Sequence, residues 1–569
     1  MKDLLRKAGR EDVVVESAAL HTDEIGNDIH YGTRQKLTEK KIPFAPRQAW
    51  LLTAAKAREY DLLIGMDAYN IADLKRLVYP EDRGKIRKLL EFAGSPRDVA
   101  DPWYTGNFDA TWDDILAGCT ALLKEFDNRA GTTRRAFIGG LTAFAILQGA
   151  SGATGKVIKA VYENGTRATD FLQCRRLYLD ICGRIPTPAE VRAYLASKKH
   201  DKYEALVDAL LQSEDYADYW AMRYCDILRV KSEFPINLWP NAVYVYHRRI
   251  RKSIADDEPW PDFARSLLCA RGSNFRVPET NFLRATADKT PAGLSETASM
   301  TFLMEPTDKY AKYFSRVGFK PTKEWKEELV YLKDGPAELV PEAFMDELEG
   351  PLQSTFYAVP AKRVYYWIFN AMPRPTALGE FKSAFARGGY RLRPLLRHAF
   401  LSSAYRAGPI RGKFPARRLD AEVLEDALCS ITGACRAYES IAPEPFSFLP
   451  PNRKSVLIED GSITNAFMLC FGRPARDTGA LEERKNDITV NQRLYLYNSS
   501  KLWNDICRMT AAKAFAEKSH AEQVEELYLK FLSRSPVKDE LEIIDPGGKG
   551  DVRNIAWHLM NSFEFLYRI

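Results

Sequence analysis

The pattern of hydrophobic and polar positions divides the chain into a shorter N-terminal part and a longer, helix-rich part. In the N-terminal part, apolar or β-branched runs at 13–15 and 62–67 predict short strands, and residues 86–92 predict a third strand. Apolar residues recur at helical spacing over 111–126, which predicts an amphipathic helix with Cys119 on its buried face. Strands separated by helical stretches indicate a parallel α/β sheet.

The rest of the chain has the spacing of amphipathic helices. Thr187 precedes Pro188, with Glu190 three residues on, so we expect Thr187 to cap a helix that begins at Pro188. Aromatic residues recur over 216–224, and such a cluster is more often core packing than a ligand contact. The apolar pattern of 555–567 predicts that the sequence ends in one helix.

Changes in composition predict the domain boundaries. Residues 127–155 contain a long uncharged stretch rich in small residues, which indicates a signal or linker. Residues 305–355 are rich in Lys, Glu and Pro, which indicates a linker or an inserted arm. The predicted segments are 1–126, 127–155, 156–304, 305–355 and 356–569.

The segment around residue 134 has the order of features of a secretory signal. Arg134 and Arg135 are followed by Phe137 and an uncharged stretch that ends in small residues near Ala150. These features resemble a twin-arginine export signal, and a buried helix or a linker is the alternative interpretation. The resemblance implies the twin-arginine export machinery as a partner. It also predicts that the N-terminal part is cytoplasmic and that the C-terminal part is exported to the periplasm or cell envelope.

Composition and charge exclude several classes of protein. The chain has 569 residues, of which 46% are hydrophobic and 28% charged, so it is expected to fold. A net charge of +6 is too weak to predict nucleic-acid binding. The nine cysteines and seven histidines form no CxxC, CxxCH or HExxH pattern, so we predict no metal site, no cofactor and no disulfide framework.

Three N-terminal runs carry a family resemblance. They are residues 15–19, 64–70 and 101–108. In this order and spacing they resemble low-molecular-weight protein tyrosine phosphatases, which implies an incomplete flavodoxin-like parallel sheet. By resemblance Asp101 is the general acid, and Trp103 and Tyr104 contact the aryl side of a phosphotyrosine protein. Ser17 matches a serine that supports the phosphate-binding loop.

The nucleophile of that family has no counterpart in these residues. The family begins with a strand and a Cys-x5-Arg-Ser loop, whereas residues 1–9 resemble the helix that follows this loop. We therefore predict an unstable module that is inactive as given. The alternative is an active phosphatase that works through phosphocysteine, with Asp101 as acid and a nucleophile supplied by upstream sequence. The run 470–476 satisfies Cys-x5-Arg, but Pro474 lacks an N–H and Asp477 follows it, so we predict no catalytic role.

The helix-rich part resembles a pair of uncharacterised bacterial domains. The first set of runs is 182–191, 290–294 and 301–303, and the second is 418–422, 471–476, 497–499 and 561–566. Such paired domains of unknown function occur in large exported proteins, often beside cytochrome c-like modules. The resemblance implies an exported, mainly α-helical region with no assigned catalytic residue.

One charged cluster stands out in the helix-rich part. It comprises Arg473, Arg476, Glu482, Glu483 and Arg484. An anion or polysaccharide site and an ion-pair network at a helix end both explain it, and we favour the network. The whole sequence thus predicts a composite chain, in which a phosphatase-like module is joined to an exported binding or scaffold factor with a possible envelope or polysaccharide partner.

Overall fold

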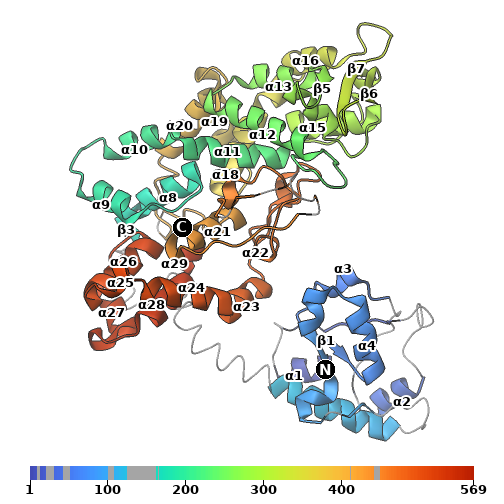
Figure 1. The fold of residues 1–569 in the computed structure, drawn as a ribbon, viewed down its shortest axis with the longest axis vertical. Coiled ribbons are helices and arrows are strands. Elements are labelled where there is room, and N and C mark those ends of the chain that lie inside the picture. The colour runs from blue at the N-terminus through green and yellow to red at the C-terminus, as the bar shows by residue number, and fades with distance from the viewer. Residues whose placement is uncertain are drawn as a thin grey trace. The chain divides into compact units, whose positions relative to one another are not determined.

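The structure is a computed structural model that describes most of the chain. The described residues are 1–8, 13, 15–20, 31–40, 42, 51–95, 97–99, 108–124, 162–164, 166–410, 412–440, 442, 447, 449–450 and 452–569. They form two compact units, Met1–Gly139 and Gly140–Ile569, which are coloured blue to cyan and cyan to red in Figure 1. Each unit is described by itself.

A strand–helix–strand element lies at the centre of the first unit. Strands β1 (Leu63–Gly65) and β2 (Ile86–Lys88) pair in parallel. Helix α4 (Ala68–Leu77) connects them, and its first turn is capped by Asp67, whose carboxylate accepts a hydrogen bond from Asn70 N at 2.6 Å. This is the parallel α/β arrangement that the sequence predicts.

The strands are shorter than the hydrophobic runs that predicted them. The strand expected over 62–67 is confirmed at its centre, and the one expected over 86–92 gives way to a 3-10 helix at Leu89–Ala93. The strand expected at 13–15 is wrong at Val13 and Val15, which have irregular backbone. A β-branched run favours extended backbone but needs a ladder partner to become a strand.

The amphipathic helix near the end of the first unit is confirmed over residues 108–124. It buries Cys119 against Leu89, Leu90 and Val99, so this thiol packs in a core as predicted. A second cluster joins Leu52, Ala57, Leu63, Leu74, Val78 and Ile86. The other helices are α1 (Lys2–Lys7), α2 (Tyr31–Glu39) and α3 (Ala54–Ala57).

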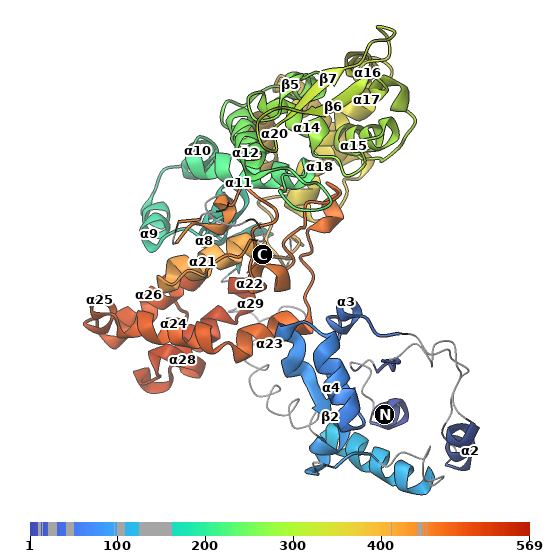
Figure 2. The same cartoon turned by 45° about the vertical axis from the view of Figure 1, so that its right-hand side comes forward.

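The second unit is mainly helical (Figures 1 and 2). Its first half contains α8 (Asp170–Cys182), α9 (Pro188–Ala196), α10 (Lys202–Leu211), α11 (Glu214–Ile227), α12 (Pro240–Ala255), α13 (Trp260–Leu268), α14 (Asn281–Arg284), α15 (Pro291–Leu303), α16 (Pro341–Glu349) and α17 (Gln353–Phe356). The second half contains α18 (Ala358–Phe369), α19 (Pro375–Arg387), α20 (Leu392–Leu401), α21 (Ala421–Thr432), α22 (Ala466–Cys470), α23 (Val490–Asn498), α24 (Ser500–Ala511), α25 (Lys513–Ala516), α26 (His520–Leu532), α27 (Lys538–Ile544), α28 (Val552–Met560) and α29 (Phe563–Leu566). One continuous core runs through both halves.

The stretch 305–355, expected to be a linker or an inserted arm, is folded. Strands β6 (Val317–Pro321) and β7 (Glu328–Leu332) pair antiparallel, and β5 (Gly272–Ser273) joins the free edge of β7. Buried side chains of this stretch, such as Phe344, belong to the same core as the helices before and after it. Its charged residues therefore cover a packed element.

The local predictions for the helices are mostly confirmed. Thr187 and Glu190 form a reciprocal capping box at the start of α9, and the aromatic residues Tyr216, Tyr219 and Trp220 are buried. The prediction of a single final helix is wrong. Helix α28 ends before Asn561, and Ser562 caps the next helix, α29, by accepting a hydrogen bond from Phe565 N. A serine at that position competes for backbone donors and starts a new helix.

The C-terminal end of the chain returns to the start of the second unit. Strand β9 (Tyr567–Arg568) pairs with β8 (Arg417–Arg418), and the buried Arg176 of α8 donates from Nε to the carbonyl of Ile569 at 2.9 Å. Tyr162 also donates to Glu564 at 2.7 Å. These contacts join the first and last segments of the unit. Within the described residues, no helix is both long and apolar enough to cross a bilayer.

Candidate functional site

One of the predicted phosphatase-site residues lies within the described part of the chain. Ser17 is exposed in irregular backbone, two residues before Ala19, whose carbonyl accepts a hydrogen bond from Leu52 N at 2.9 Å. Outside the described residues lie Asp101, Trp103 and Tyr104, and likewise Arg134, Arg135 and Phe137 of the predicted export signal. The roles of all these residues stay predictions.

The segment before the predicted acid loop is anchored next to β1. The N–H of Val99 donates to the carbonyl of Met66 at 2.9 Å, and Met66 directly follows β1. Ligands of open α/β sheets bind beyond the carboxyl ends of the strands. Val99 therefore lies at the edge of the sheet where a phosphate site is expected.

The Cys-x5-Arg run at 470–476 has no phosphate cradle. The N–H groups of Phe471, Gly472 and Arg473 donate to the main-chain carbonyls of residues 467–469. The guanidinium of Arg476 is buried and donates to Asp226 at 2.9 Å and to a main-chain carbonyl at 2.7 Å. These three N–H groups and the Arg476 guanidinium thus already have acceptors within the protein.

Arg476 belongs to an arginine–carboxylate network inside the second unit. We give this name to Arg223, Asp226, Arg417, Asp420, Glu422, Arg473, Arg476 and Arg484. Arg484 bridges two helices, because it lies 2.7 Å from Asp226 of α11 and 2.6 Å from Glu422 of α21. Arg223 pairs with Asp420, which also accepts a hydrogen bond from Asn486 at 3.0 Å.

The arginines keep the buried carboxyls of this network ionised. Burial alone would raise the pKa of Asp420, but the charges of Arg223, Arg417 and Arg484 hold it far below its ordinary value. Burial likewise opposes ionisation of Glu422, and Arg484 and Arg473 nevertheless lower its pKa to about 2. Both carboxylates are therefore charged at neutral pH and bind the arginines as true ion pairs.

The network confirms the favoured interpretation of the charged cluster only in part. Arg473, Arg476 and Arg484 do belong to it, but Glu483 accepts hydrogen bonds from the N–H groups of Asp477 and Thr478 instead. Sequence reasoning missed the carboxylates that pair with these arginines, because they lie far away along the chain. No local spacing signals such partners.

A cavity of about 670 Å³ lies beside the network. Its walls come from α11, α18, the β8 and β9 strands, and the segment that leads from Pro474 to Ile488. Charged side chains that line it are Arg223, Asp226, Arg417, Arg418, Glu482, Arg484, Lys485 and Asp487. Tyr366, Trp367 and Tyr567 add aromatic surface. This volume suits a small organic ligand.

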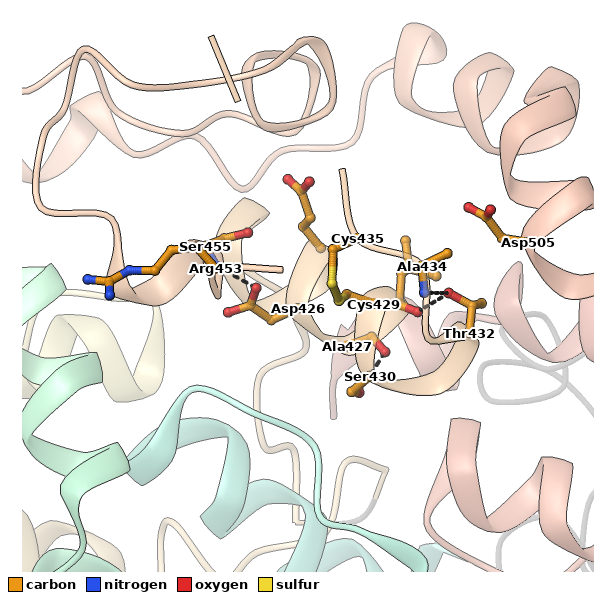
Figure 3. Close-up of a disulfide and its surroundings, with 12 residues drawn as sticks. Asp426, Ala427, Cys429, Ser430, Thr432, Ala434, Cys435, Arg453, Ser455 and Asp505 are labelled. Carbon is orange, nitrogen blue, oxygen red and sulfur yellow. Dashed lines mark hydrogen bonds between the residues drawn. A yellow bond between two sulfur atoms is a disulfide. The ribbon is translucent and has the colours of Figure 1, made fainter. Parts of the chain in front are cut away.

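A disulfide that the sequence did not predict closes the end of α21 (Figure 3). It joins Cys429 to Cys435, around Gly433, which ends the helix with a φ of +69°. One turn earlier, Asp426 accepts hydrogen bonds from the N–H groups of Ser455 and Val456, at 2.6 and 3.1 Å, while burial raises its pKa to about 6. Two cysteines flanking a helix-ending glycine were the available signal.

A second cavity, of about 650 Å³, borders the disulfide. Its lining includes Cys182 and residues 183–188 from the first half of the unit, and Asp426 and Cys429 from the second half. Across the described residues, no group of three or more His, Cys, Asp or Glu side chains is placed to hold a metal ion. The network cavity is lined by eight charged side chains, and this second cavity by six.

Comparison with known families assigns three regions. Residues 1–131 match the family of low molecular weight phosphotyrosine protein phosphatases. Residues 156–319 match a protein family of unknown function, DUF1549, and residues 372–546 match another, DUF1553. The resemblances of the sequence to a phosphatase family and to a pair of uncharacterised domains are thereby confirmed.

Several individual relatives and solved structures are similar to part of the chain. The chain is 32% identical over 124 residues to the low molecular weight protein-tyrosine-phosphatase PtpA of Staphylococcus aureus strain MRSA252, which covers 22% of this chain and 79% of the relative. Among solved structures, YfkJ from Bacillus subtilis is 32% identical with a TM-score of 0.22, covering 22% of this chain and 82% of that one. SP-PTP from Streptococcus pyogenes is also 32% identical, with a TM-score of 0.19 and coverages of 20% and 75%.

Proposed function

The chain belongs, through residues 1–131, to the low molecular weight phosphotyrosine protein phosphatase family, and we propose that this module does not hydrolyse phosphotyrosine in the 569-residue polypeptide. Cleavage of a phosphomonoester by this chemistry needs a thiolate nucleophile, a cradle of N–H groups and a proton donor. Asp101 would supply only the proton.

The state of the Cys-x5-Arg run at 470–476 carries this proposal. It is the one segment of the sequence that satisfies the spacing. Arg476 is held by Asp226, and the preceding N–H groups donate to main-chain carbonyls. Because these donors already have acceptors within the protein, they do not form a cradle for a phosphate dianion.

Hydrolysis of p-nitrophenyl phosphate by the purified full chain tests the proposal. We expect no turnover above the enzyme-free blank for the wild type, for Asp101→Asn or for Cys470→Ser. Turnover that is lost in Asp101→Asn would overturn the proposal and favour an active phosphatase. Turnover that is lost in Cys470→Ser would instead assign the nucleophile to the second unit.

We propose a second function for residues 162–569, which is to act as one exported ligand-binding unit. The cavity walls support it, because α11 lies in the region matched to DUF1549, while Arg484 and Asp487 lie in the region matched to DUF1553. The network crosses the same boundary through the pairs of Arg484 with Asp226 and of Arg223 with Asp420. The disulfide supports an oxidising location, where such bonds persist.

Sequencing the N-terminus of the protein from the cell envelope tests the export step. A twin-arginine signal at Arg134 and Arg135 predicts a mature chain that starts near Ser151 to Thr154. The variant Arg134→Lys/Arg135→Lys should leave the full-length chain in the cytoplasm. Full-length wild-type protein found in the cytoplasm alone would contradict export.

A further inference from the structure

The buried charges around the network cavity do not balance. Six arginines, Arg223, Arg417, Arg418, Arg473, Arg476 and Arg484, adjoin three carboxylates, Asp226, Asp420 and Glu422. Five of the six arginines are buried residues, and the side chain of the sixth, Arg484, is 7% exposed. Burying a cation is costly unless an anion lies close to it. Among these buried groups the arginines outnumber the carboxylates, and the other carboxylates that line the cavity, Glu482 and Asp487, are exposed.

Backbone carbonyls accept hydrogen bonds from Arg417 and Arg418, but a carbonyl carries no net charge and does not neutralise the arginine. Arg418 donates to the carbonyls of Leu419, Phe471 and Lys485 at 2.6–2.7 Å. Arg417 donates to the carbonyl of Trp367 at 2.8 Å, and its nearest carboxylate oxygen, on Asp420, is 3.8 Å away. Burial lowers the pKa of both arginines, and the charge of Asp420 opposes this shift without cancelling it.

The surplus faces the cavity. Arg223, Arg417, Arg418 and Arg484 line it, and Lys485 adds an exposed cation at the same wall. A planar guanidinium presents paired N–H groups that match the oxygens of a carboxylate or phosphate. An oxyanion in the cavity would thus supply the missing negative charge next to side chains already held in place.

The same cavity also has an aromatic surface. Trp367 packs edge-on against Trp220, with ring centroids 5.6 Å apart, and this contact fixes its ring. Tyr366 and Tyr567 also line the cavity. Fixed rings beside cations accommodate a ligand that has a ring-sized body and a charged end.

We propose that the network cavity binds an organic oxyanion, a carboxylate or phosphate carried on a ring-sized body. The proposal rests on the function inferred above for residues 162–569 and names the ligand chemistry of that unit. A uronic acid represents the carboxylate form of such a ligand, and a sugar phosphate represents the phosphate form. Both would place the oxyanion at the arginines and the ring against Trp367.

Titration calorimetry with the full chain tests the proposal, with sodium glucuronate and glucose 6-phosphate as probes and glucose as the neutral control. We expect at least one oxyanion to bind and glucose not to bind. Lys485→Glu reverses a charge at the cavity wall without disturbing a buried residue, so it should weaken binding about tenfold or more. The matched control Lys538→Glu changes a lysine that is 88% exposed and does not line the cavity, and should bind as the wild type does.

Each outcome decides the proposal. Glucuronate binding identifies a carboxylate ligand, and glucose 6-phosphate binding identifies a phosphate. Absence of binding by both probes overturns the proposal, as does equal affinity for glucose or equal affinity in Lys485→Glu. A failure of export would appear separately, in the N-terminal sequence of the envelope fraction, and would leave the calorimetric result unchanged.

Discussion

In residues 1–124 the described apolar side chains form two small clusters beside a two-stranded sheet. In the second unit, one large core connects helices from both halves. The charges differ in the same way. In the first unit, the ion pair of Arg97 with Asp114 has an exposed arginine. In the second unit, both side chains of the Arg223–Asp420 pair are buried. Exposed pairs contribute little to stability, and broken buried pairs cost much. The comparison teaches that the second unit depends on buried long-range ion pairs, whereas the long-range pairs of the first unit, such as Lys36 with Asp109, keep an exposed partner.

Removing one network carboxylate should have the largest effect. Asp420→Asn leaves Arg223, Arg417 and Arg484 buried without that anion, so the free energy of unfolding of the second unit should fall by about 3–5 kcal/mol. Urea denaturation followed by circular dichroism measures it. The control Asp201→Asn removes an exposed carboxylate that makes no capping bond and should change little. Equal effects of both variants would contradict a structural network.

Core truncations test whether the two units unfold independently. Phe302→Ala should lower the stability of the second unit by about 3–5 kcal/mol, and Leu74→Ala should lower that of the first by about 2–5 kcal/mol. We expect two denaturation transitions, each shifted by only one of the variants. A single transition shifted by both would show that the units unfold together.

Loss of the disulfide should affect the second unit alone. Cys429→Ser/Cys435→Ser frees a short loop in the unfolded chain, so the second transition should lose about 2 kcal/mol of stability. Dithiothreitol should have the same effect on the wild type and none on the variant. The control Cys507→Ser, which removes a cysteine outside the disulfide, should leave both transitions in place.

The smallest expected difference lies in the pH dependence. Burial raises the pKa of Glu425 from 4.5 to about 7, so the folded protein holds this proton more tightly than the unfolded chain does. Its contribution to stability is therefore present below pH 4.5 and is lost as the pH rises through 7. As the pH rises from about 5 to about 8, the free energy of unfolding should therefore fall in the wild type. In Glu425→Gln this fall should be smaller by about 1–2 kcal/mol.

A carboxyl of the first unit provides the control for this titration. Arg87 lowers the pKa of Glu91, and a depressed pKa makes a contribution that is lost only as the pH falls. Glu91→Gln should therefore leave the slope of stability against pH unchanged over the same range. An identical slope in Glu425→Gln and the wild type would show that Glu425 titrates normally.

Local sequence patterns predicted much of the fold. The capping box at Thr187, the helix that buries Cys119 and the strand at 63–65 each depend on residues a few positions apart. Patterns failed where a neighbouring element decided the outcome. Val13 and Val15 are β-branched but lie in irregular backbone, and the final helix breaks where Ser562 caps a new turn.

The sequence by itself determined the periodic faces of the helices, which are carried by residues at short, regular spacing. It also determined the family of the N-terminal module, which is carried by three short runs of residues in a fixed order. The tertiary structure alone decided the arginine–carboxylate network and its cavity. Arg484 and Asp226 are 258 positions apart, and Arg223 and Asp420 are 197 apart. Charge pairing over such separations depends on which helix faces meet, and that is decided when apolar burial assembles both halves around one core.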